Sequence, residues 1–439
     1  MFKKSIYNIL IKESHGKTLI FNTYSTALGV LNLDLKDLYN NIESEYDKNN
    51  KDIIFLKENG FIVDHNIDEF KRLCVEERVN RFDDSILNLT IAPTMSCNMI
   101  CSYCYEAKSN QFMNNNVIHK LITFINKKII KNNLKEINLV WYGGEPLLCI
   151  ELLKKISCKI ILLCNKYNIK YSSSIVTNGV LLDVNTAKIL KHQCKINHVQ
   201  ITIDGLRIMH NKRRRLKNNE DSFNIIIKNI NDINDILNII IRVNIDKKNI
   251  MEMHKLIDYL IDYTNLGNKV KINFHPIVVK NTDFCNVEEK HCINAKEFDN
   301  IEATLINKLY NKGAIDSIYK LDPMHNSVFC TAVCNNSFVI DPEGFLYACW
   351  DFIGIKEKRI GSIFDDEISI NSERCKWLLL DIPQQCSTCN LVPMCKGGCP
   401  SARLYNNKPC CDPRVMSLKE KLHISYDNFK NTLSSSYNE

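Results

Sequence analysis

The clearest pattern in the chain is a regular alternation of short apolar runs with longer amphipathic segments, which begins near residue 85. Runs rich in Ile, Val and Leu predict β-strands, and intervals such as Val117–Ile130 and Leu152–Cys164, with apolar residues at helical spacing, predict helices. The predicted strands are Leu87–Ile91, Ile137–Tyr142, Tyr171–Val176, His198–Ile203, Ile239–Ile245 and Val270–Phe274. This alternation predicts βαβ units, a parallel sheet and an α/β domain over residues 85–310.

The first 80 residues follow a different pattern. Two β-like runs and a turn-like segment come first, and two helical patterns then lead to a short strand. These segments are Ile6–Ile11, 13–17, Thr18–Phe21, Leu33–Ile42, Asp52–Glu58 and Phe61–Val63. We predict a small winged-helix-like domain over residues 1–80, and a purely structural extension is the alternative.

Twenty cysteines in a chain of 439 residues change this picture. The N-terminus has neither a signal-peptide core nor an apolar run that could span a bilayer, so we expect a cytoplasmic protein without a membrane partner. In such a protein many cysteines indicate metal rather than disulfides, and so many reduced thiols fit an anaerobic habitat.

Three of the cysteines, Cys97, Cys101 and Cys104, follow the first predicted strand with the spacing C-x3-C-x2-C. Three thiolates can hold an iron–sulfur cube and leave one iron open, where the amine and carboxylate of a small molecule can chelate. A zinc site normally has a fourth residue nearby. Zinc and buried unligated cysteines are the alternatives.

The net charge of +7 is modest, but the basic residues at 212–215 are consecutive. A nucleic-acid surface would interleave basic residues with base-stacking aromatics, and none are interleaved here. We therefore expect no nucleic-acid partner, and interpret this run as a solvated face with one anchoring arginine.

The cysteine loop, with Tyr103 just before its last cysteine, resembles the signature of the radical S-adenosylmethionine (SAM) enzymes. The resemblance implies a [4Fe–4S] cluster on Cys97, Cys101 and Cys104, which reduces SAM to methionine and a 5′-deoxyadenosyl radical. It also implies a partial (βα)6 TIM-like barrel, with the chemistry at the C-terminal ends of the strands.

Two motifs after predicted strands fit the same resemblance. Gly143-Gly144-Glu145-Pro146 resembles the GGEP motif, which contacts the SAM amino group. Thr177-Asn178-Gly179 resembles the TNG motif near the SAM ribose, although the tripeptide alone is ordinary turn chemistry.

Thr202 to Arg214 resembles the segment S-x-D-G…H-D-x-x-R, with Thr202 in place of serine and Asn211 in place of aspartate. Thr202 keeps a hydroxyl for SAM. We expect Arg214 to bind the SAM carboxylate, because a guanidinium matches a carboxylate fork; Arg213 and Arg215 are alternatives, and His210 is expected to brace the loop. Arg242, inside a predicted strand, is expected to pair with a ligand or carboxylate inside the barrel.

The C-terminal third resembles the SPASM extension of radical SAM enzymes. Cys334 precedes Gly344 by nine intervening residues and Cys349 follows after four more, and further cysteines stand at 386, 389, 395, 399, 410 and 411. The resemblance implies an iron–sulfur SPASM domain over residues 325–425 with two auxiliary [4Fe–4S] clusters. Zinc is the alternative. A helical segment, Val415–Phe429, and a tail at 426–439 complete the chain.

The resemblance also assigns the auxiliary ligands. The first cluster is expected to take Cys334, Cys349 and Cys399, with Cys330 as a fourth; the second is expected to take Cys386, Cys389, Cys395 and either Cys410 or Cys411. If Cys330 is not a ligand, one iron is open to a substrate thiolate. Asp351 lies near the position where some relatives place a general base, and a lone exposed aspartate is the alternative.

The function implied by these resemblances is that of a radical SAM/SPASM maturase of a ribosomally made (RiPP) precursor peptide. The peptide is expected to contain cysteine, and the product to be a thioether or a carbon–carbon cross-link. The N-terminal domain would bind the leader through β-augmentation, and a flavodoxin or ferredoxin would donate electrons. An anaerobic sulfatase maturase that forms formylglycine, and a noncatalytic metal-cluster binding module, are the alternatives.

Overall fold

The computed structural model describes residues 1–12, 17–43, 50–264, 266, 269–280, 282–314, 327–406, 409–412, 415 and 418–436. They form two compact units. The terminal unit comprises Met1–Phe82, Lys320–Cys330 and Leu380–Glu439, and the barrel unit comprises Asp83–Tyr319 and Thr331–Leu379. The predicted domains followed one another along the chain, whereas these units combine segments that are far apart in sequence.

The barrel unit is built on a nine-stranded sheet with the order β13-β12-β10-β9-β8-β6-β14-β15-β16. Its first six strands pair in parallel, which confirms the predicted α/β fold. They are β6 (Ile86–Ile91), β8 (Glu136–Trp141), β9 (Lys170–Thr177), β10 (Ile196–Thr202), β12 (Asn238–Ile245) and β13 (Val270–Pro276). Each lies within two residues of its predicted bounds.

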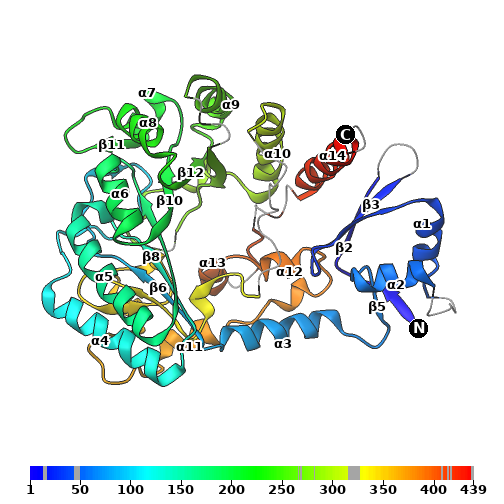
Figure 1. Ribbon diagram of the computed structural model, residues 1–439, viewed down its shortest axis with the longest axis horizontal. Coiled ribbons are helices and arrows are strands. Elements are labelled where there is room, and N and C mark those ends of the chain that lie inside the picture. Colours follow the sequence, from blue (N-terminus) through cyan, green and yellow to red (C-terminus); the bar gives the residue numbers. More distant parts are fainter. Residues whose placement is uncertain are drawn as a thin grey trace. The chain divides into compact units, whose positions relative to one another are not determined.

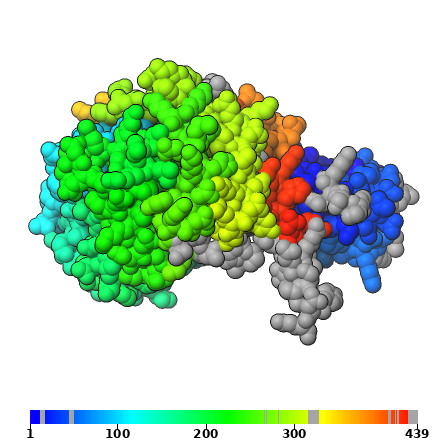
Figure 2. Space-filling model, turned by 90° about the horizontal axis from the view of Figure 1, so that it is seen from above, coloured from blue at the N-terminus to red at the C-terminus, as the bar shows by residue number. Residues whose placement is uncertain are grey.

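Helices lie along the outer face of this sheet (Figure 1). They are α4 (Asn115–Asn132), α5 (Ile150–Tyr167), α6 (Val184–His192), α7 (Arg207–Arg213), α8 (Ser222–Ile233), α9 (Met253–Asp258) and α10 (Ala295–Asn311). Asn114, Asp183 and Asp221 begin three of them by accepting a hydrogen bond from a first-turn amide. α9 and α10 are joined by Lys308 and Asp258, 2.7 Å apart, and form part of the green to yellow-green surface in Figure 2.

The two faces of the sheet differ in polarity. Residues that face the helices, such as Leu139, Ile201 and Ile241, are almost completely buried. Because side chains alternate along a strand, their neighbours Gln200 and Arg242 point to the opposite face. The alternation therefore builds an apolar core on the helical side and leaves a polar inner face.

β14 (Ser337–Ile340) extends this sheet beyond β6, to which it is parallel, and β15 (Phe345–Tyr347) and β16 (Gly361–Ser362) continue it in antiparallel pairing. The sequence assigned this stretch to the cysteine-rich domain. It joins the barrel unit because β6 offers a free edge and Phe338 packs edge-on against Phe124 of α4. Helix α11 (Ser372–Leu378) follows in the same unit.

The terminal unit contains a three-stranded antiparallel sheet and a two-stranded one. The first has the order β2 (Asn8–Lys12), β3 (Thr18–Asn22) and β4 (Leu28–Leu31), and the second pairs β1 (Phe2–Lys4) with β5 (Ile62–Asp64). The helices are α1 (Leu33–Asn40), α2 (Lys51–Glu58), α3 (Glu69–Arg81), α12 (Val392–Cys395), α13 (Pro400–Asn406) and α14 (Leu418–Ser436). Part of the predicted turn, 13–16, lies outside the described residues, and α3 was not predicted.

Apolar residues pack on both faces of the three-stranded sheet. Ile9, Leu19 and Phe21 pack with Met394 and Leu422 from the C-terminal segments. On the other face, Ile20 packs with a second set of apolar residues from the N-terminal elements, Leu31, Tyr39, Leu56 and Phe61. The first 82 residues therefore share a core with the cysteine-rich end of the chain. In the described part of the chain, no helix combines the length and apolarity that crossing a membrane requires.

Candidate active site

A cavity of about 740 Å³ opens on the polar inner face of the barrel sheet. Its lining includes side chains from β8, β9, β10 and β12, together with the cysteine loop. The predicted site residues that line it are Cys97, Cys101, Tyr103, Cys104, Gly143, Gly144, Thr177, Asn178, Thr202, Arg214 and Arg242. The fold thus brings together residues from five separate sequence segments.

The cysteine loop is held by a short antiparallel ladder. β7 (Met99–Cys101) pairs with β11 (Arg214–Leu216), with Cys101 opposite Arg214. The Ser102 amide also donates to the Arg213 carbonyl at 2.9 Å. This ladder places a guanidinium directly beside the cysteine loop, at the cavity wall.

Two glycines are required where the loop after β8 meets the start of the cysteine loop. A Cβ atom on Gly143, whose φ is +111°, would lie 2.4 Å from the Thr94 carbonyl oxygen, and one on Gly144 would lie 2.3 Å from that of Ser96. The Gly144 amide instead donates to the Thr94 carbonyl at 3.1 Å. Close backbone approach therefore explains both glycines.

Glu145 joins two loops rather than lining the cavity. Its fully buried carboxylate accepts hydrogen bonds from the Thr177 hydroxyl and the Asn178 amide, both at 2.7 Å, and from the Leu147 amide at 3.0 Å. Burial raises the pKa of this carboxyl above its ordinary value. Pro146 follows it as the first residue of a short 3-10 turn. The expected contact of this motif with the SAM amino group stays a prediction.

Asn178 connects the loop after β9 to the cysteines. Its Nδ2 donates to Asn98 Oδ1 at 2.7 Å and lies 4.0 Å from Cys97 Sγ. The Met99 amide also donates to Cys97 Sγ, at 3.4 Å. The first cysteine is therefore positioned from two sides.

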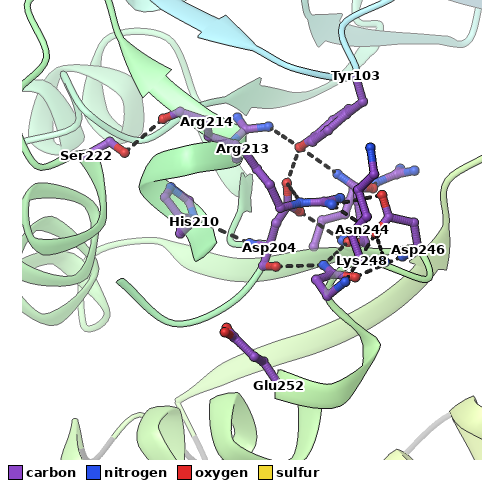
Figure 3. Close-up of polar contacts among 12 residues, drawn as sticks. Tyr103, Asp204, His210, Arg213, Arg214, Ser222, Asn244, Asp246, Lys248 and Glu252 are labelled. Carbon is purple, nitrogen blue, oxygen red and sulfur yellow. Dashed lines mark hydrogen bonds and ion pairs between the residues drawn. The ribbon is translucent and has the colours of Figure 1, made fainter. Parts of the chain in front are cut away.

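Figure 3 shows a buried polar network behind the cysteine loop. The Tyr103 hydroxyl donates to the buried Asp204 carboxylate and accepts from Arg214 at 2.7 Å and from Asn244 at 3.3 Å. Asn249 donates to the Asp204 carbonyl at 2.7 Å. The sequence motifs did not single out Asn244 or Asn249. Asn244 lies in the C-terminal half of β12 and Asn249 follows that strand, where the site was expected.

The network assigns different tasks to the consecutive arginines. Arg213 is buried and bonds both oxygens of Asp246, at 2.8 and 2.9 Å. Arg214 lines the cavity, and its buried Nε has no hydrogen-bond partner among the described residues. Arg215 is exposed. Of the three, Arg214 is the one placed to receive an anionic group of a ligand.

Two residues of the segment from Thr202 to Arg214, His210 and Asn211, stabilise it through hydrogen bonds. The Nδ1 atom of His210 accepts from the Asp204 amide at 3.3 Å, and burial holds the His210 pKa well below its usual value. Asn211, which replaces the aspartate of the motif, accepts from the Ser222 hydroxyl and the Phe223 amide, both at 2.9 Å. Asparagine in place of aspartate therefore still provides an oxygen that accepts these hydrogen bonds.

Arg242 is half-buried at the cavity wall, as expected for a residue inside the barrel. Its Nε donates to Asn244 Oδ1 at 2.8 Å. Its partner in the structure is therefore an amide, which leaves the positive charge directed toward the cavity.

Aromatic and charged side chains form another wall of the cavity. Tyr142 stacks on Trp350 with ring centroids 4.9 Å apart, and its hydroxyl is 2.8 Å from that of Tyr105. Asp351, adjacent to Trp350, is buried and forms an ion pair with Lys280 at 2.8 Å. The alternative of an exposed Asp351 is therefore wrong. The sequence did not identify Lys280, which follows the last barrel strand.

The donor set fits a cluster with an open coordination position. The three thiols line one cavity, and burial raises the pKa of Cys97 to about 12, so a bound cation is needed to keep its thiolate. No three or more His, Cys, Asp or Glu side chains in the described ranges are placed to hold a single metal ion. The thiolates of an iron–sulfur cube instead bind separate irons.

The predicted auxiliary ligands are distributed over both units. Cys334 and Cys349 belong to the barrel unit; the others, Cys330, Cys386, Cys389, Cys395, Cys399, Cys410 and Cys411, belong to the terminal unit. Their assignment to two clusters stays a prediction.

Residues 91–260 match the Radical SAM superfamily. A cysteine-type anaerobic sulfatase-maturating enzyme of Clostridium novyi is 28% identical over 348 residues, which cover 71% of this chain and 87% of that protein. The radical SAM cyclopropyl synthase TigE of Paramaledivibacter caminithermalis is 24% identical over 445 residues, with 93% and 86% covered.

Two solved structures have a similar fold. The structure of anSMEcpe with bound AdoMet and Cp18Cys peptide has a TM-score of 0.59 and 19% identity, and covers 80% of this chain and 99% of that chain. Streptococcus suis SuiB bound to precursor peptide SuiA has a TM-score of 0.53 and 14% identity, with 93% and 98% covered.

Proposed function

We propose that this chain, whose residues 91–260 form a radical SAM domain, modifies a ribosomally made, cysteine-containing precursor peptide. The chain is a radical SAM enzyme related to sulfatase and peptide maturases, and this excludes the noncatalytic binding module. When bound, the [4Fe–4S] cluster and SAM supply a radical that removes a hydrogen atom from the substrate. The thioether or carbon–carbon product and the flavodoxin or ferredoxin donor belong to the proposal.

The observation that carries the proposal is the length of the matches. TigE and SuiB each cover 93% of this chain, and SuiB has been solved with a precursor peptide. The Clostridium novyi sulfatase-maturating enzyme leaves more than a quarter of this chain uncovered. A peptide maturase therefore accounts for more of the chain than a sulfatase maturase does.

The chain's own residues would hold the cofactors through the contacts described above. Cys97, Cys101 and Cys104 would bind the cluster, and Arg214 would bind the SAM carboxylate through its guanidinium edge. Thr202 offers a hydroxyl from the end of β10. The buried network around Tyr103 would then keep the guanidinium in place.

The substrate would enter along the wall that carries Trp350 and Tyr142. Asp351 has one oxygen bonded to Lys280, and its buried Oδ1 has no partner among the described residues. In this proposal, that oxygen would accept a proton from the substrate. Lys280 would then act as a positioning residue, because it holds the carboxylate in one orientation.

The leader would bind at the free edge of β4 in the terminal unit. Among the described strands β4 pairs only with β3, and Leu28 and Val30 are each 36% exposed on it. The opposite edge strand, β2, is approached by Asn390, whose Nδ2 donates to the Asn8 carbonyl. An added peptide strand would gain main-chain hydrogen bonds along β4 and apolar contacts with both side chains.

A sulfatase maturase is the second candidate. It is favoured by the identity of 28% over 348 residues to the Clostridium novyi enzyme. Asp351, which is buried beside the aromatic wall, would serve as its base equally well.

Anaerobic co-expression separates the two candidates. The chain is expressed with each short open reading frame that adjoins its gene, or with a cysteine-type sulfatase, and the products are analysed by mass spectrometry. We expect a peptide that has lost two hydrogens, which the Cys97→Ala variant does not produce. Formylglycine in the sulfatase, with every peptide unmodified, would contradict the proposal.

A further inference from the structure

The short ladder of β7 and β11, which holds the cysteine loop, has two different faces. Cys101 and Arg214 are paired in this ladder, and both line the cavity. Ile100 and Arg215 form the neighbouring pair, and both are exposed. Because successive side chains of a strand point to opposite faces, the ladder directs a predicted cluster ligand toward the cavity and the second pair toward solvent.

The exposed face of the ladder lies directly behind the cysteine loop. Ile100, which is 45% exposed, is joined to Cys101 by one peptide bond. On one side of the ladder the Lys217 amide donates to the Asn98 carbonyl at 3.0 Å. The bond from the Ser102 amide to the Arg213 carbonyl continues the contact on the other side. A protein that docks on this face therefore comes within one residue of a predicted ligand of the cluster.

This exposed face is positively charged. Lys212, Arg215 and Lys217 are all exposed, and their side chains have no ion-pair partner among the described residues. Arg215 and Lys217 are two positions apart and so point to the same side, next to Ile100. Residues 212–219 include no aspartate or glutamate. The face thus combines one apolar side chain with a group of cations that the fold does not neutralise.

Such a face suits a partner with an acidic surface around an exposed apolar group. Complementary charge guides the encounter of two proteins and sets their orientation, and complexes that transfer electrons have small, transient interfaces. A flavodoxin offers the apolar edge of its flavin within an acidic surface. A nucleic acid would stack its bases on aromatic side chains, and neither β7 nor β11 contains an aromatic residue.

We propose that Ile100, Lys212, Arg215 and Lys217 form the docking surface for an acidic flavodoxin that reduces the cluster on the three cysteines. One electron leaves the reduced flavin of the donor and enters the oxidised [4Fe–4S] cluster, and no bond is made or broken. The inference rests on the electron donor of the proposed function. Flavodoxin binding is measured without a peptide, so its failure is distinguishable from a failure of peptide modification.

The first test is a calorimetric titration of the reconstituted enzyme with oxidised flavodoxin at low ionic strength. The test variant reverses the three charges, with the substitutions Lys212→Glu, Arg215→Glu and Lys217→Glu. We expect its dissociation constant for flavodoxin to rise by about tenfold or more, because carboxylates would then face the acidic surface of the donor.

A matched control separates a local effect from the change in net charge. Three other exposed lysines without an ion-pair partner among the described residues lie on the helices α4, α5 and α6, and the control variant carries Lys120→Glu, Lys159→Glu and Lys188→Glu. Its dissociation constant for flavodoxin should stay within about twofold of that of the parent. Equal dissociation constants in the two variants would overturn the proposal.

The second test compares two reductants by the release of deoxyadenosine from SAM. Dithionite is a small ion that needs no docking surface, so the test variant should match the parent with dithionite and react more slowly than the parent with reduced flavodoxin. Slower release with both reductants would place these cations in the cofactor site and overturn the docking role. Weaker binding of the precursor peptide with unchanged binding of flavodoxin would assign the surface to the peptide instead.

Iron content and circular dichroism of each variant are compared with those of the parent. A test variant that loses iron or its native spectrum is replaced by Arg215→Gln, which removes one charge from the exposed face of the ladder. The dissociation constant of flavodoxin should then rise by a smaller factor, and an unchanged constant would contradict the proposal.

Discussion

The consecutive arginines Arg213 and Arg214 have different roles in the buried polar network of the barrel unit. Arg213 and Arg214 stand where α7 ends and β11 begins, so their side chains leave the backbone in different directions. Arg213 neutralises Asp246 inside the protein, whereas Arg214 lines the cavity. One guanidinium therefore stabilises the fold, and the other is available to a ligand.

Glutamine substitutions distinguish these tasks. Arg213→Gln leaves Asp246 buried without its charge partner, which costs about 3–5 kcal/mol of unfolding free energy and lowers the melting temperature. Arg214→Gln should weaken SAM binding at least tenfold, by about 1.4 kcal/mol or more, with a smaller change in stability. Calorimetry and SAM titration of both variants check the result. The reverse pattern would assign the cavity role to Arg213.

The Tyr103 hydroxyl joins Arg214 to Asp204. Tyr103→Phe removes that link while the ring stays in place, so iron content should be unchanged. Hydrogen bonds to charged groups contribute about 1.5–3 kcal/mol, and we expect SAM affinity to fall by about tenfold or more. Tyr105→Phe is the matched control, since its hydroxyl bonds to Tyr142, and should change SAM affinity less than twofold. Equal affinities in both variants would show that the network does not position Arg214.

At the residue level, the sequence identified part of the cavity lining, because most of those residues stand in recognisable motifs at or just after the C-terminal end of an apolar strand. It did not identify their partners. Asn244, Asp246 and Asn249 come from one short stretch of ordinary polar residues, and Lys280 pairs with a residue 71 positions away. Such pairs depend on the folded geometry, so no spacing pattern in the sequence predicts them.

At the level of elements, apolar runs located all six barrel strands because each is buried against helices. β14 was not predicted as part of that sheet. The residues around a short apolar run such as Ser337–Ile340 do not indicate which sheet edge it joins. Helix α3 escaped prediction because Phe70 and Leu73 are its only large apolar residues that are fully or nearly fully buried.

Lysine substitution tests the edge of β4, because lysine on an edge strand discourages further pairing. The double variant Leu28→Lys/Val30→Lys should raise the dissociation constant of the leader peptide at least tenfold. Deoxyadenosine release from SAM without peptide should be unchanged. Leu33→Lys is the control, since Leu33 is 67% exposed at the start of α1. Similar dissociation constants in the control and the double variant would exclude this edge.

At the scale of the whole molecule, the chain does not divide into consecutive domains. The N-terminal sheet shares a core with Met394, Leu422 and Tyr426. This arrangement couples the proposed leader-binding strands to the segment that carries the cysteines predicted for the second cluster. The sequence showed both regions, but their association depends on contacts between residues almost 400 positions apart.

Deletion of residues 1–82 should therefore damage more than leader binding. Exposure of the shared core costs on the order of 1.5–3 kcal/mol for each large apolar side chain. We expect a lower melting temperature and loss of iron from the second cluster, measured by calorimetry and iron analysis. A deletion variant with native stability and full iron content would show that the first 82 residues fold independently.

Deuterium transfer is the most direct measurement of peptide modification by this chain. The reconstituted enzyme is reduced with SAM and a precursor peptide deuterated on its carbon atoms, and the deoxyadenosine is analysed by mass spectrometry. We expect deuterium in the deoxyadenosine and a peptide that has lost two hydrogens, with neither product from the Cys97→Ala variant. Unlabelled deoxyadenosine together with an unchanged peptide would contradict the proposed function.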